Sequence, residues 1–336
     1  MAEKKKSIVR ALDLGWGFAK YSKYDPATES YNYLSFPSLA PRAAGLDLSL
    51  SILGKRNTVI VNVEGTSYEV GPDSGDLDTT DSTRNLNDQY IHTDQYKAVF
   101  YGALHYIGES VIDLLVVGLP LSNMVNAGKL KDFCIGKHKI NASETIEVKD
   151  VLVLPQPLGG LYRCLSEPKP EFEFLREETN LVIDPGFLTF DFLLSNGDKI
   201  IENKSNAHIG GVSKVLRAIC ESISQKFKIK YDNLSAIDKG LRRRRIKING
   251  VVENLEEHIR NTRPVIEGSI NYMKNIVGDG ADIDNIILLG GGSMLYQKTI
   301  ETYYPSHTLI VLEDGQLANV MGFQAAGLEY VKAKVA

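Results

Sequence analysis

The sequence has 336 residues, of which 43% are hydrophobic and 24% are charged, and its formal net charge is −4. This length allows two domains with separate cores, and the charge gives no reason to expect direct nucleic-acid binding. No stretch approaches the roughly 18–20 apolar residues of a membrane span, and the lysines at positions 4–6 precede no signal-peptide pattern. The three cysteines, Cys134, Cys164 and Cys220, are far apart, which fits packing in a reducing compartment. We therefore expect a cytoplasmic protein with no membrane partner.

In the first half of the chain, short strands precede a helix. Residues 37–55 are rich in Pro and Gly and residues 72–88 in Asp, which is typical of exposed loops. From Asp94 onward, apolar residues recur with the spacing of a helix that buries one face. The region from about 37 to 93 therefore looks like an insertion into a first domain. The predicted strands are 8–12, 18–24, 31–36, 58–63, 67–70, 114–119 and 146–154, and a second helix is predicted over 122–133.

The second half alternates strands and helices from Leu181 onward, which is typical of an α/β fold. Gly210-Gly211 opens a helix with an apolar face, and Pro264 must start or kink a helical stretch over 255–277. A small hairpin is predicted at 246–252, turning at Asn249-Gly250. The remaining predicted elements are strands at 181–183, 200–203, 285–289 and 309–312 and a helix over 316–334.

The same short pattern occurs twice, 171 positions apart. Residues 13–20 read DLGWGFAK and residues 184–191 read DPGFLTFD, each after an apolar run. Each predicts a strand, an Asp, a Gly-containing turn and a returning strand, so that backbone N–H groups can converge on an anion. Taken alone, either one is an ordinary hairpin. Two of them facing each other would clamp one polyphosphate between two domains, and an Asp in each suits a hydrated metal ion. Nucleotide phosphate is therefore the leading ligand.

A third pattern follows the predicted strand at 285–289. Three successive glycines, at positions 290–292, let the backbone approach a flat ring or a phosphate closely. The alternative is the strand-to-helix turn of any doubly wound sheet. The pattern is not a dinucleotide-binding fingerprint, because Gly-x-Gly-x-x-Gly at a first βα turn is absent, and the chain has no Walker loop.

With these three elements in this order, the chain resembles the actin-like ATPase superfamily. Residues 13–20 look like its first phosphate loop, residues 182–191 like its second, and residues 287–294 like its adenosine motif. Within the superfamily, the chain resembles plasmid-segregation actins of the ParM/StbA type, whose wording residues 316–323 share. The two connecting motifs of the family are matched at 115–120 and 316–323, and a motif of plasmid- and phage-borne members, including those of PRTRC gene clusters, at 36–42.

The resemblance covers nearly the whole chain and implies the duplicated actin-like (ribonuclease H-like) α/β fold, with a nucleotide cleft between two domains. It implies a domain I of residues 1–180, with subdomain IB inserted at about 37–93. Domain II would comprise residues 181–315, with subdomain IIB inserted at about 212–268, and a helix over 316–336 would return to domain I.

The resemblance also implies roles for single residues. Asp13 and Asp184 would hold hydrated Mg²⁺, and Gln156 would orient the attacking water. Because a neutral amide is a poor general base, we expect slow turnover. The other candidates would bind the phosphates or the nucleoside of ATP, with GTP left open: Gly15, Trp16, Gly17, Lys20, Gly186, Phe187, Leu188, Thr189, Gly210, Gly211, Lys214, Gly290, Gly291, Gly292, Ser293 and Met294.

Two departures from the family pattern affect the expected geometry. Trp16 stands where a small hydroxyl residue often bonds the phosphate, so that contact would come from the backbone. Phe187-Leu188 replaces a pair of small residues, which predicts a wider or differently shaped turn. Neither departure removes the expected anion site.

Arg242-Arg243-Arg244-Arg245 with Lys247 invites a nucleic-acid interpretation. No aromatic residues interleave for base stacking, so we favour a solvated edge strand or a contact between subunits. The histidines show no metal-ligand spacing and are expected to be surface or packed residues: His92, His105, His138, His208, His258 and His307.

Three functions compete. The first is an ATPase whose hydrolysis is coupled to assembly into homopolymer filaments, which would move plasmid DNA through a DNA-binding adaptor protein. The second is a small-molecule kinase of the same fold, which needs a carboxylate base over a substrate hydroxyl. The third is a regulatory nucleotide-binding module without turnover. The candidate kinase bases are Asp73, Asp76, Asp78 and Asp94, none of them in a recognisable motif.

Overall fold

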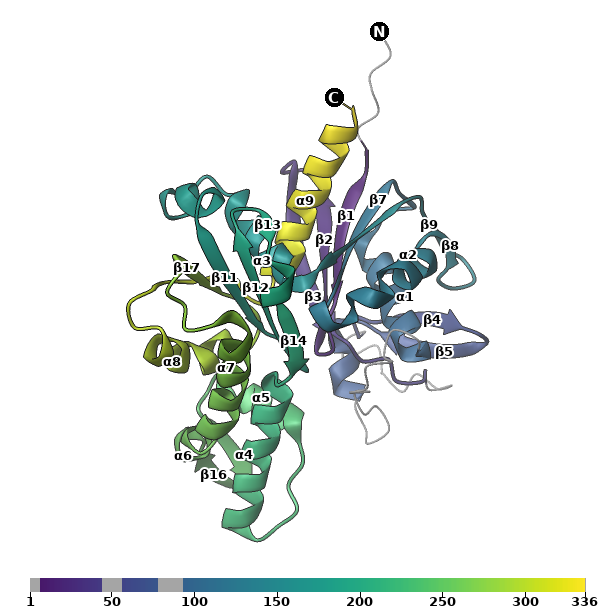
Figure 1. Cartoon of the computed structure of the whole chain (residues 1–336). Helices are drawn as coiled ribbons and strands as arrows, with labels where there is room; N and C mark the ends of the chain where they lie inside the picture. Colours follow the sequence, from purple (N-terminus) through teal and green to yellow (C-terminus); the bar gives the residue numbers. More distant parts are fainter. Residues whose placement is uncertain (1–6, 44–55, 78–92, 336) are drawn as a thin grey trace. The chain divides into compact units, whose positions relative to one another are not determined.

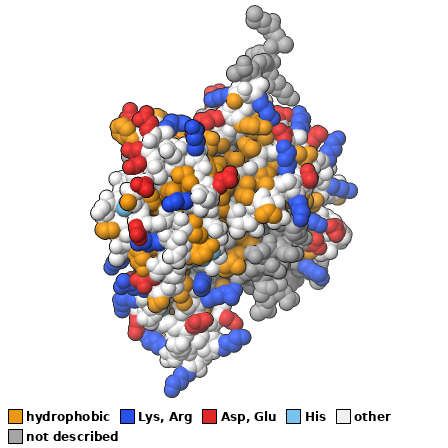
Figure 2. All heavy atoms as spheres, viewed as in Figure 1, with side chains coloured by type: hydrophobic (Ala, Val, Ile, Leu, Met, Phe, Trp, Pro, Cys, Tyr) orange, Lys and Arg blue, Asp and Glu red, His pale blue; other side chains and the backbone are white. Residues whose placement is uncertain are grey.

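Two mixed sheets with helices packed against them form the core of the fold (Figure 1), here a computed structural model. The structure describes residues 7–43, 56–77 and 93–335. Its strands and helices confirm the predicted α/β class. None of the helices in these ranges has the length and apolar character needed to cross a bilayer. On the face shown in Figure 2, hydrophobic side chains are interspersed with Lys, Arg, Asp and Glu side chains.

The chain divides into a first unit, Met1–Glu173 with Gln316–Ala336, and a second unit, Phe174–Gly315. The first unit contains a five-stranded sheet of order β10-β7-β1-β2-β3. Its parallel strands β1 and β7 are buried along their whole length, as expected at the centre of a covered sheet. These strands are β1 (Val9–Leu14), β2 (Phe18–Asp25), β3 (Ser30–Pro37), β7 (Leu114–Leu119) and β10 (Val151–Pro155).

Two helices from distant parts of the sequence pack together on this sheet. They are α3 (Gln156–Leu165) and the C-terminal helix α9 (Ala318–Val335). On α1 (Asp94–Ile107), the Thr93 side chain caps the start and Gly108, with φ of 81°, ends the helix. The other elements are β4 (Val59–Val63), β5 (Thr66–Val70), η1 (Pro72–Leu77), β6 (Val111–Ile112), η3 (Leu121–Asn126), α2 (Ala127–Cys134), β8 (Gly136–Lys139), β9 (Thr145–Val148) and η4 (Pro170–Arg176).

The second unit contains a sheet of order β13-β12-β11-β17-β18, with β14 also paired to β12. The strands are β11 (Thr179–Pro185), β12 (Thr189–Asn196), β13 (Lys199–Ile200), β14 (Asn206–Ile209), β17 (Asn285–Leu288) and β18 (Thr308–Val311). The remaining elements are η5 (Glu202–Lys204), α4 (Val212–Phe227), α5 (Leu234–Leu241), β15 (Arg245–Ile248), β16 (Val251–Asn254), α6 (Glu256–Arg260), α7 (Arg263–Val277) and α8 (Ser293–Tyr303).

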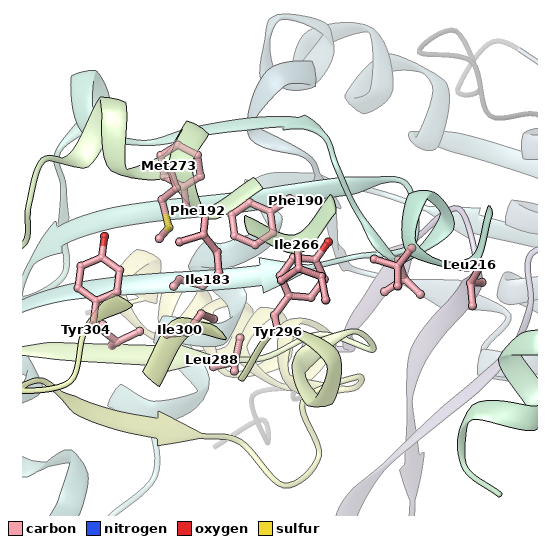
Figure 3. Close-up of a cluster of buried hydrophobic side chains, with 14 of the residues drawn as sticks. Ile183, Phe190, Phe192, Leu216, Ile266, Met273, Leu288, Tyr296, Ile300 and Tyr304 are labelled. Carbon is pink, nitrogen blue, oxygen red and sulfur yellow. The ribbon is translucent and has the colours of Figure 1, made fainter. Parts of the chain in front are cut away.

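The core of the second unit joins this sheet to α4, α7 and α8 (Figure 3). Phe190 and Phe192 alternate with polar residues along β12 and face Tyr296 of α8 and Met273 of α7. The rings of Phe190 and Tyr296 lie 5.2 Å apart. Burying large aromatic and aliphatic side chains from three helices against one sheet stabilises the unit.

Several predicted elements differ from those observed. Residues 122–133 form a 3₁₀ helix followed by α2 rather than one helix. Residues 146–154 form two strands in different sheets, because the chain turns at Lys149-Asp150 and Asp150 Oδ1 accepts the amide of Val151. Residues 200–203 form the end of a two-residue strand and a 3₁₀ turn. The subdomain boundaries, part of which fall outside the described residues, stay a prediction.

Other predictions are confirmed. The hairpin at Asn249-Gly250 is formed by β15 and β16. Pro264 lies in the first turn of α7, where its missing N–H has no helical partner to lose. The three cysteines are free and buried, as expected for small apolar side chains.

Candidate functional site

The first Asp-Gly turn places three of the candidate side chains in contact. Asp13 and Lys20 are cross-strand partners on β1 and β2, and Lys20 Nζ lies 2.7 Å from Asp13 Oδ2. Gln156, the first residue of α3, donates from Nε2 to Asp13 Oδ1 at 2.6 Å. Asp13 is fully buried, so these two charge-assisted bonds satisfy a carboxylate that is removed from water. The structure thus brings Asp13, Lys20 and Gln156 together, although 143 positions separate the first from the last.

The position of Gln156 depends on how α3 packs against α9. A Cβ on Gly322 of α9 would collide with the carbonyl oxygen of Gly159 of α3, so the two helix backbones approach very closely. Asn319 Oδ1 accepts the amide of Gly160 at 3.1 Å. The C-terminal helix therefore fixes the helix whose first residue is Gln156.

Ser38, which follows β3, holds the first Asp-Gly turn through two hydrogen bonds. Its hydroxyl donates to the carbonyl of Gly15 at 2.6 Å, and its amide donates to the carbonyl of Gly17 at 3.0 Å. With these carbonyl oxygens occupied, the amide groups are what the turn can offer to an anion. Sequence reasoning did not assign a role to Ser38. The available signal was the pairing of β2 with β3, which places Pro37 opposite Phe18.

The second Asp-Gly turn is bonded to the start of α4. The amides of Gly211, Val212 and Ser213 donate to the carbonyls of Leu188, Gly186 and Phe187 at 3.0, 2.9 and 2.7 Å, in that order. These bonds satisfy amides that the start of a helix cannot satisfy internally. The α4 amides are therefore engaged by the turn, and the carbonyl oxygens of the turn point toward α4.

Gly211 makes this contact possible. The nearest atoms to a Cβ there would all be backbone atoms, including the carbonyl oxygen of Thr189 at 2.7 Å and that of Gly186. Lys214, which was expected near the nucleoside, is exposed in the first turn of α4.

The glycine-rich segment packs against Asp184 and Pro185. Gly290 has φ of 86°, and a Cβ there would collide with Asp184 Oδ1. The amide of Gly292 donates to the carbonyl of Pro185 at 3.0 Å. Gly291 and Met294, which is 77% exposed, face solvent, whereas Ser293 is buried. The segment therefore offers backbone and one apolar side chain to a ligand.

The carbonyl of Gly210 links these segments. It accepts Tyr296 Oη at 2.6 Å and Ser269 Oγ at 3.0 Å, so α8 and α7 both fix the position of Gly210. Burial raises the pKa of Tyr296 to about 12, which keeps its hydroxyl a donor. His208 stacks on Tyr272 with ring centroids 4.3 Å apart. Burial, and then the charge of Lys214, lower the pKa of His208. Neither Tyr296 nor Ser269 was predicted from the sequence.

The unusual residues of the two turns are accommodated by packing. Leu188 is buried, and Phe187 packs against the hydrophobic core of the second unit. Trp16 is also buried. Thr189 is buried at the start of β12, with its Oγ1 on the side of Gly186. The bulky side chains thus serve the core, and the backbone forms the turn surface.

Asp13 and Asp184 fit the carboxylates expected to hold hydrated Mg²⁺. Each lies near the carboxyl end of a buried strand, directly before a glycine turn. Mg²⁺ commonly keeps several waters and takes one or two carboxylates plus phosphate oxygens. Over the described ranges, no three His, Cys, Asp or Glu side chains form a metal-binding group. Taken by itself, each carboxylate fits an ion that arrives with phosphates rather than one held by protein alone.

Comparison with known proteins identifies the class. Residues 11–159 match the family model of the actin-like proteins N-terminal domain, and none of the curated proteins compared matches the sequence. The chain is similar to solved structures over nearly its whole length. These include the apo psk41 ParM protein (23% identity, TM-score 0.65, 98% of this chain and 99% of that chain). They also include the archaeal actin homologue Ta0583 (19% identity, TM-score 0.76, 98% of this chain and 100% of that chain). A third is a 15-stranded ParM filament from Clostridium botulinum (17% identity, TM-score 0.77, 96% of this chain and 99% of that chain).

The chain therefore has the actin-like fold that its motifs predicted. More particularly, the match over residues 11–159 is to the N-terminal domain of the actin-like proteins, and the fold is one that solved ParM proteins share.

Proposed function

We propose that this protein is an actin-like ATPase that binds and hydrolyses ATP with Mg²⁺ and assembles into filaments. The observation that carries the proposal is the contact of Asp13 with both Lys20 and Gln156 beside a glycine turn. This arrangement supplies a cation for phosphates and an amide for water, as phosphoryl transfer to water requires. Ta0583 has also been solved with ADP, and the Clostridium botulinum ParM forms a filament.

Each residue has a role in this proposal. Lys20 acts as a point charge for the phosphates. The amides of residues 15–17 and 186–188 bind the β- and γ-phosphates. The segment 290–294 and Gly210-Gly211 contact the nucleoside, and Gln156 orients the attacking water. Asp13 and Asp184 would hold Mg²⁺ through water, and the ion would neutralise phosphate charge. Because the amide of Gln156 orients water without removing its proton, turnover is slow.

The cellular role proposed with this activity is plasmid segregation. The filament would engage plasmid DNA through a DNA-binding adaptor protein rather than directly. ATP is the proposed nucleotide, and GTP is the alternative. Assembly and phosphate release measured with each nucleotide distinguish the two.

The test measures light scattering, pelleting and phosphate release with ATP, GTP and a non-hydrolysable ATP analogue. We expect ATP and its analogue to drive assembly and only ATP to release phosphate. Absence of both assembly and phosphate release would refute the proposal. Phosphate transfer that requires an added alcohol would favour the kinase alternative.

Two substitutions test the site. Asp184→Ala should abolish hydrolysis, and Gln156→Ala should slow it roughly 100-fold while ATP binding is retained, because only water orientation is lost. Gln297→Ala, on the exposed face of α8, is the matched control and should hydrolyse ATP normally. Normal hydrolysis by Asp184→Ala would show that the assignment of this carboxylate is wrong.

The kinase alternative gains no support from the described carboxylates. Asp73 accepts the amide of Asn57 at 2.6 Å, and Asp94 lies 3.6 Å from Lys97 at the start of α1. Both are thus engaged in local structure. The side chains of Asp76 and Asp78 lie outside the described part of the chain.

A further inference from the structure

The hairpin of β15 and β16 carries exposed positive charge and exposed apolar side chains. Arg242, Arg243, Arg245 and Lys247 are exposed and have no ion pair with a described residue. On β16, Val251 is 63% and Val252 is 55% exposed, although neighbouring strand residues point to opposite faces. We call these six residues the basic hairpin. Ile248 of β15 is buried in the core of the second unit, so one side of the hairpin is anchored there and the exposed side chains are open to a partner.

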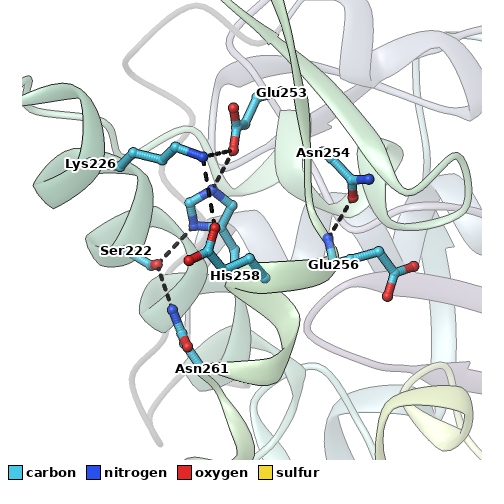
Figure 4. A network of polar contacts seen from close by, with 8 residues as sticks. Ser222, Lys226, Glu253, Asn254, Glu256, His258 and Asn261 are labelled. Atoms are coloured by element: carbon cyan, nitrogen blue, oxygen red, sulfur yellow. Dashed lines mark hydrogen bonds and ion pairs between the residues drawn. The ribbon is translucent and has the colours of Figure 1, made fainter.

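A polar network holds the basic hairpin rigidly on α4 (Figure 4). His258 of α6 bonds Ser222 of α4 through Nδ1 at 2.8 Å and Glu253 of β16 through Nε2 at 3.0 Å. Lys226 of α4 donates to the same Glu253 carboxylate at 2.7 Å. His258 is buried, and the Lys226 hydrogen bond is the largest cause that lowers the pKa of Glu253. The hairpin is therefore a preformed surface, which reduces the entropy lost on docking.

A second exposed surface, of opposite charge, lies where β11 and β17 begin. Glu177, Asp198, Asp282 and Asp284 are exposed there and are in no ion pair with a described residue. Phe174, beside them, is 60% exposed. We call these five residues the acidic end. Backbone bonds hold it together: the Gly197 amide donates to the carbonyl of Glu178, and the Asp284 amide to that of Thr179, both at 2.9 Å.

The two surfaces lie at opposite ends of the second unit. The acidic end precedes β11, whereas the turn that follows β11 is bonded to the start of α4. From there α4 continues for 16 residues, about 24 Å, before the hairpin attaches to its last turns. Figure 1 accordingly places β13, which pairs with the end of β12 beside the acidic end, far from β16.

We propose that the basic hairpin of one copy docks on the acidic end of the next copy. The surfaces are opposite in net charge, because the four carboxylates of the acidic end outnumber the exposed cations beside them, Arg176 and Lys199. Each surface also adds exposed apolar side chains. Two different surfaces at opposite ends of one unit make a head-to-tail contact, which repeats without closing. The inference rests on the proposed filament function and names its contact. The valines and the lack of interleaved aromatic residues favour this partner over nucleic acid.

Charge reversal with rescue tests the contact in the full-length protein. Arg243→Glu/Arg245→Glu and Glu177→Arg/Asp282→Arg should each raise the critical concentration for ATP-dependent pelleting at least about tenfold, because attraction becomes repulsion. A chain carrying all four changes should assemble again. An equimolar mixture of the two double variants should also assemble. Lys129→Glu/Lys332→Glu, which exchanges two exposed lysines of the first unit, is the matched control and should pellet like the wild type.

The outcomes separate the two proposals. If the wild type does not assemble with any nucleotide, the filament function is wrong and the contact falls with it. If the wild type assembles and either double variant pellets normally, or the fourfold variant is not rescued, the function stands and the contact is wrong. If Arg243→Glu/Arg245→Glu pellets normally but loses binding to duplex DNA, the hairpin is a nucleic-acid surface instead.

Discussion

Replacing Gly211 with Ala tests whether the second Asp-Gly turn and α4 form one rigid structure. The added Cβ would lie 2.7 Å from the carbonyl oxygen of Thr189 and would collide with that of Gly186. Both neighbours are backbone, so no side chain can rotate to make room. The turn must move away from α4, which stretches the bonds that the amides of Gly211 and Val212 donate to it.

The expected loss combines two effects. Overpacking at a site that cannot relax costs about 1–3 kcal/mol, and weakening one of these hydrogen bonds costs about 0.5–1.5 kcal/mol. A total of about 3 kcal/mol would lower the Tm of a unit of this size by roughly 6–12 °C. If the turn binds phosphates as proposed, its displacement should also weaken ATP binding, because its amides would no longer converge on them.

Differential scanning calorimetry and titration with a fluorescent ATP analogue measure the two effects. Gly128→Ala, in α2 and outside the proposed site, is the matched control, since a Cβ at Gly128 would have no neighbour within 4 Å and the residue does not have a left-handed backbone. It should lower neither Tm nor affinity. If Gly211→Ala matches the control in both measurements, the turn and α4 are not coupled as argued here.

Three further substitutions probe other features. Ser38→Ala removes the hydroxyl bond to Gly15 and should weaken ATP binding about 2- to 10-fold with a smaller effect on kcat; equal affinity would contradict that role. Gly268→Ala, exposed in α7 with no neighbour within 4 Å, should stabilise the protein by about 0.5–1 kcal/mol in urea unfolding. His208→Phe tests pH dependence. Burial lowers the pKa of His208, so the unfolded chain binds the proton more readily and stability falls as pH drops below about 6.5. The variant should lose less stability from pH 7 to pH 5 than the wild type, and an unchanged slope would exclude this contribution.

The two Asp-Gly turns were predictable because their signal is local. An apolar run, an Asp and a glycine within a few positions are sufficient to predict a strand and a tight turn. The contact between Asp13 and Gln156 is different, because it depends on β7 pairing with both β1 and β10. Only the family resemblance suggested that these residues act together, and nothing in the spacing alone required it.

The environment of Gly210-Gly211 was the least predictable part of the site. A glycine pair before a helix suggests amides that are open to an anion. In the structure, the α4 amides are instead bonded to the turn after β11, and Tyr296 and Ser269 bind the Gly210 carbonyl. These bonds come from segments about 25 to 90 positions away, and their geometry depends on packing that periodicity does not encode. The division of residues 146–154 into two strands was missed for a similar reason.

The bond between Gln156 and Asp13 also determines which end of the Gln156 amide is available. A carboxylate that already accepts a bond from Lys20 can only accept another, so the amide nitrogen must face it. The carbonyl oxygen is then the end of this side chain that is left to bind a water. In the proposed reaction, this oxygen would accept a hydrogen of that water, which leaves a lone pair of the water oxygen for attack on phosphorus. A glutamate at this position would set one carboxylate against another and would have to carry a proton or turn away. Asp13 thus determines that the oxygen of the Gln156 amide, and not its nitrogen, is the atom left for a water.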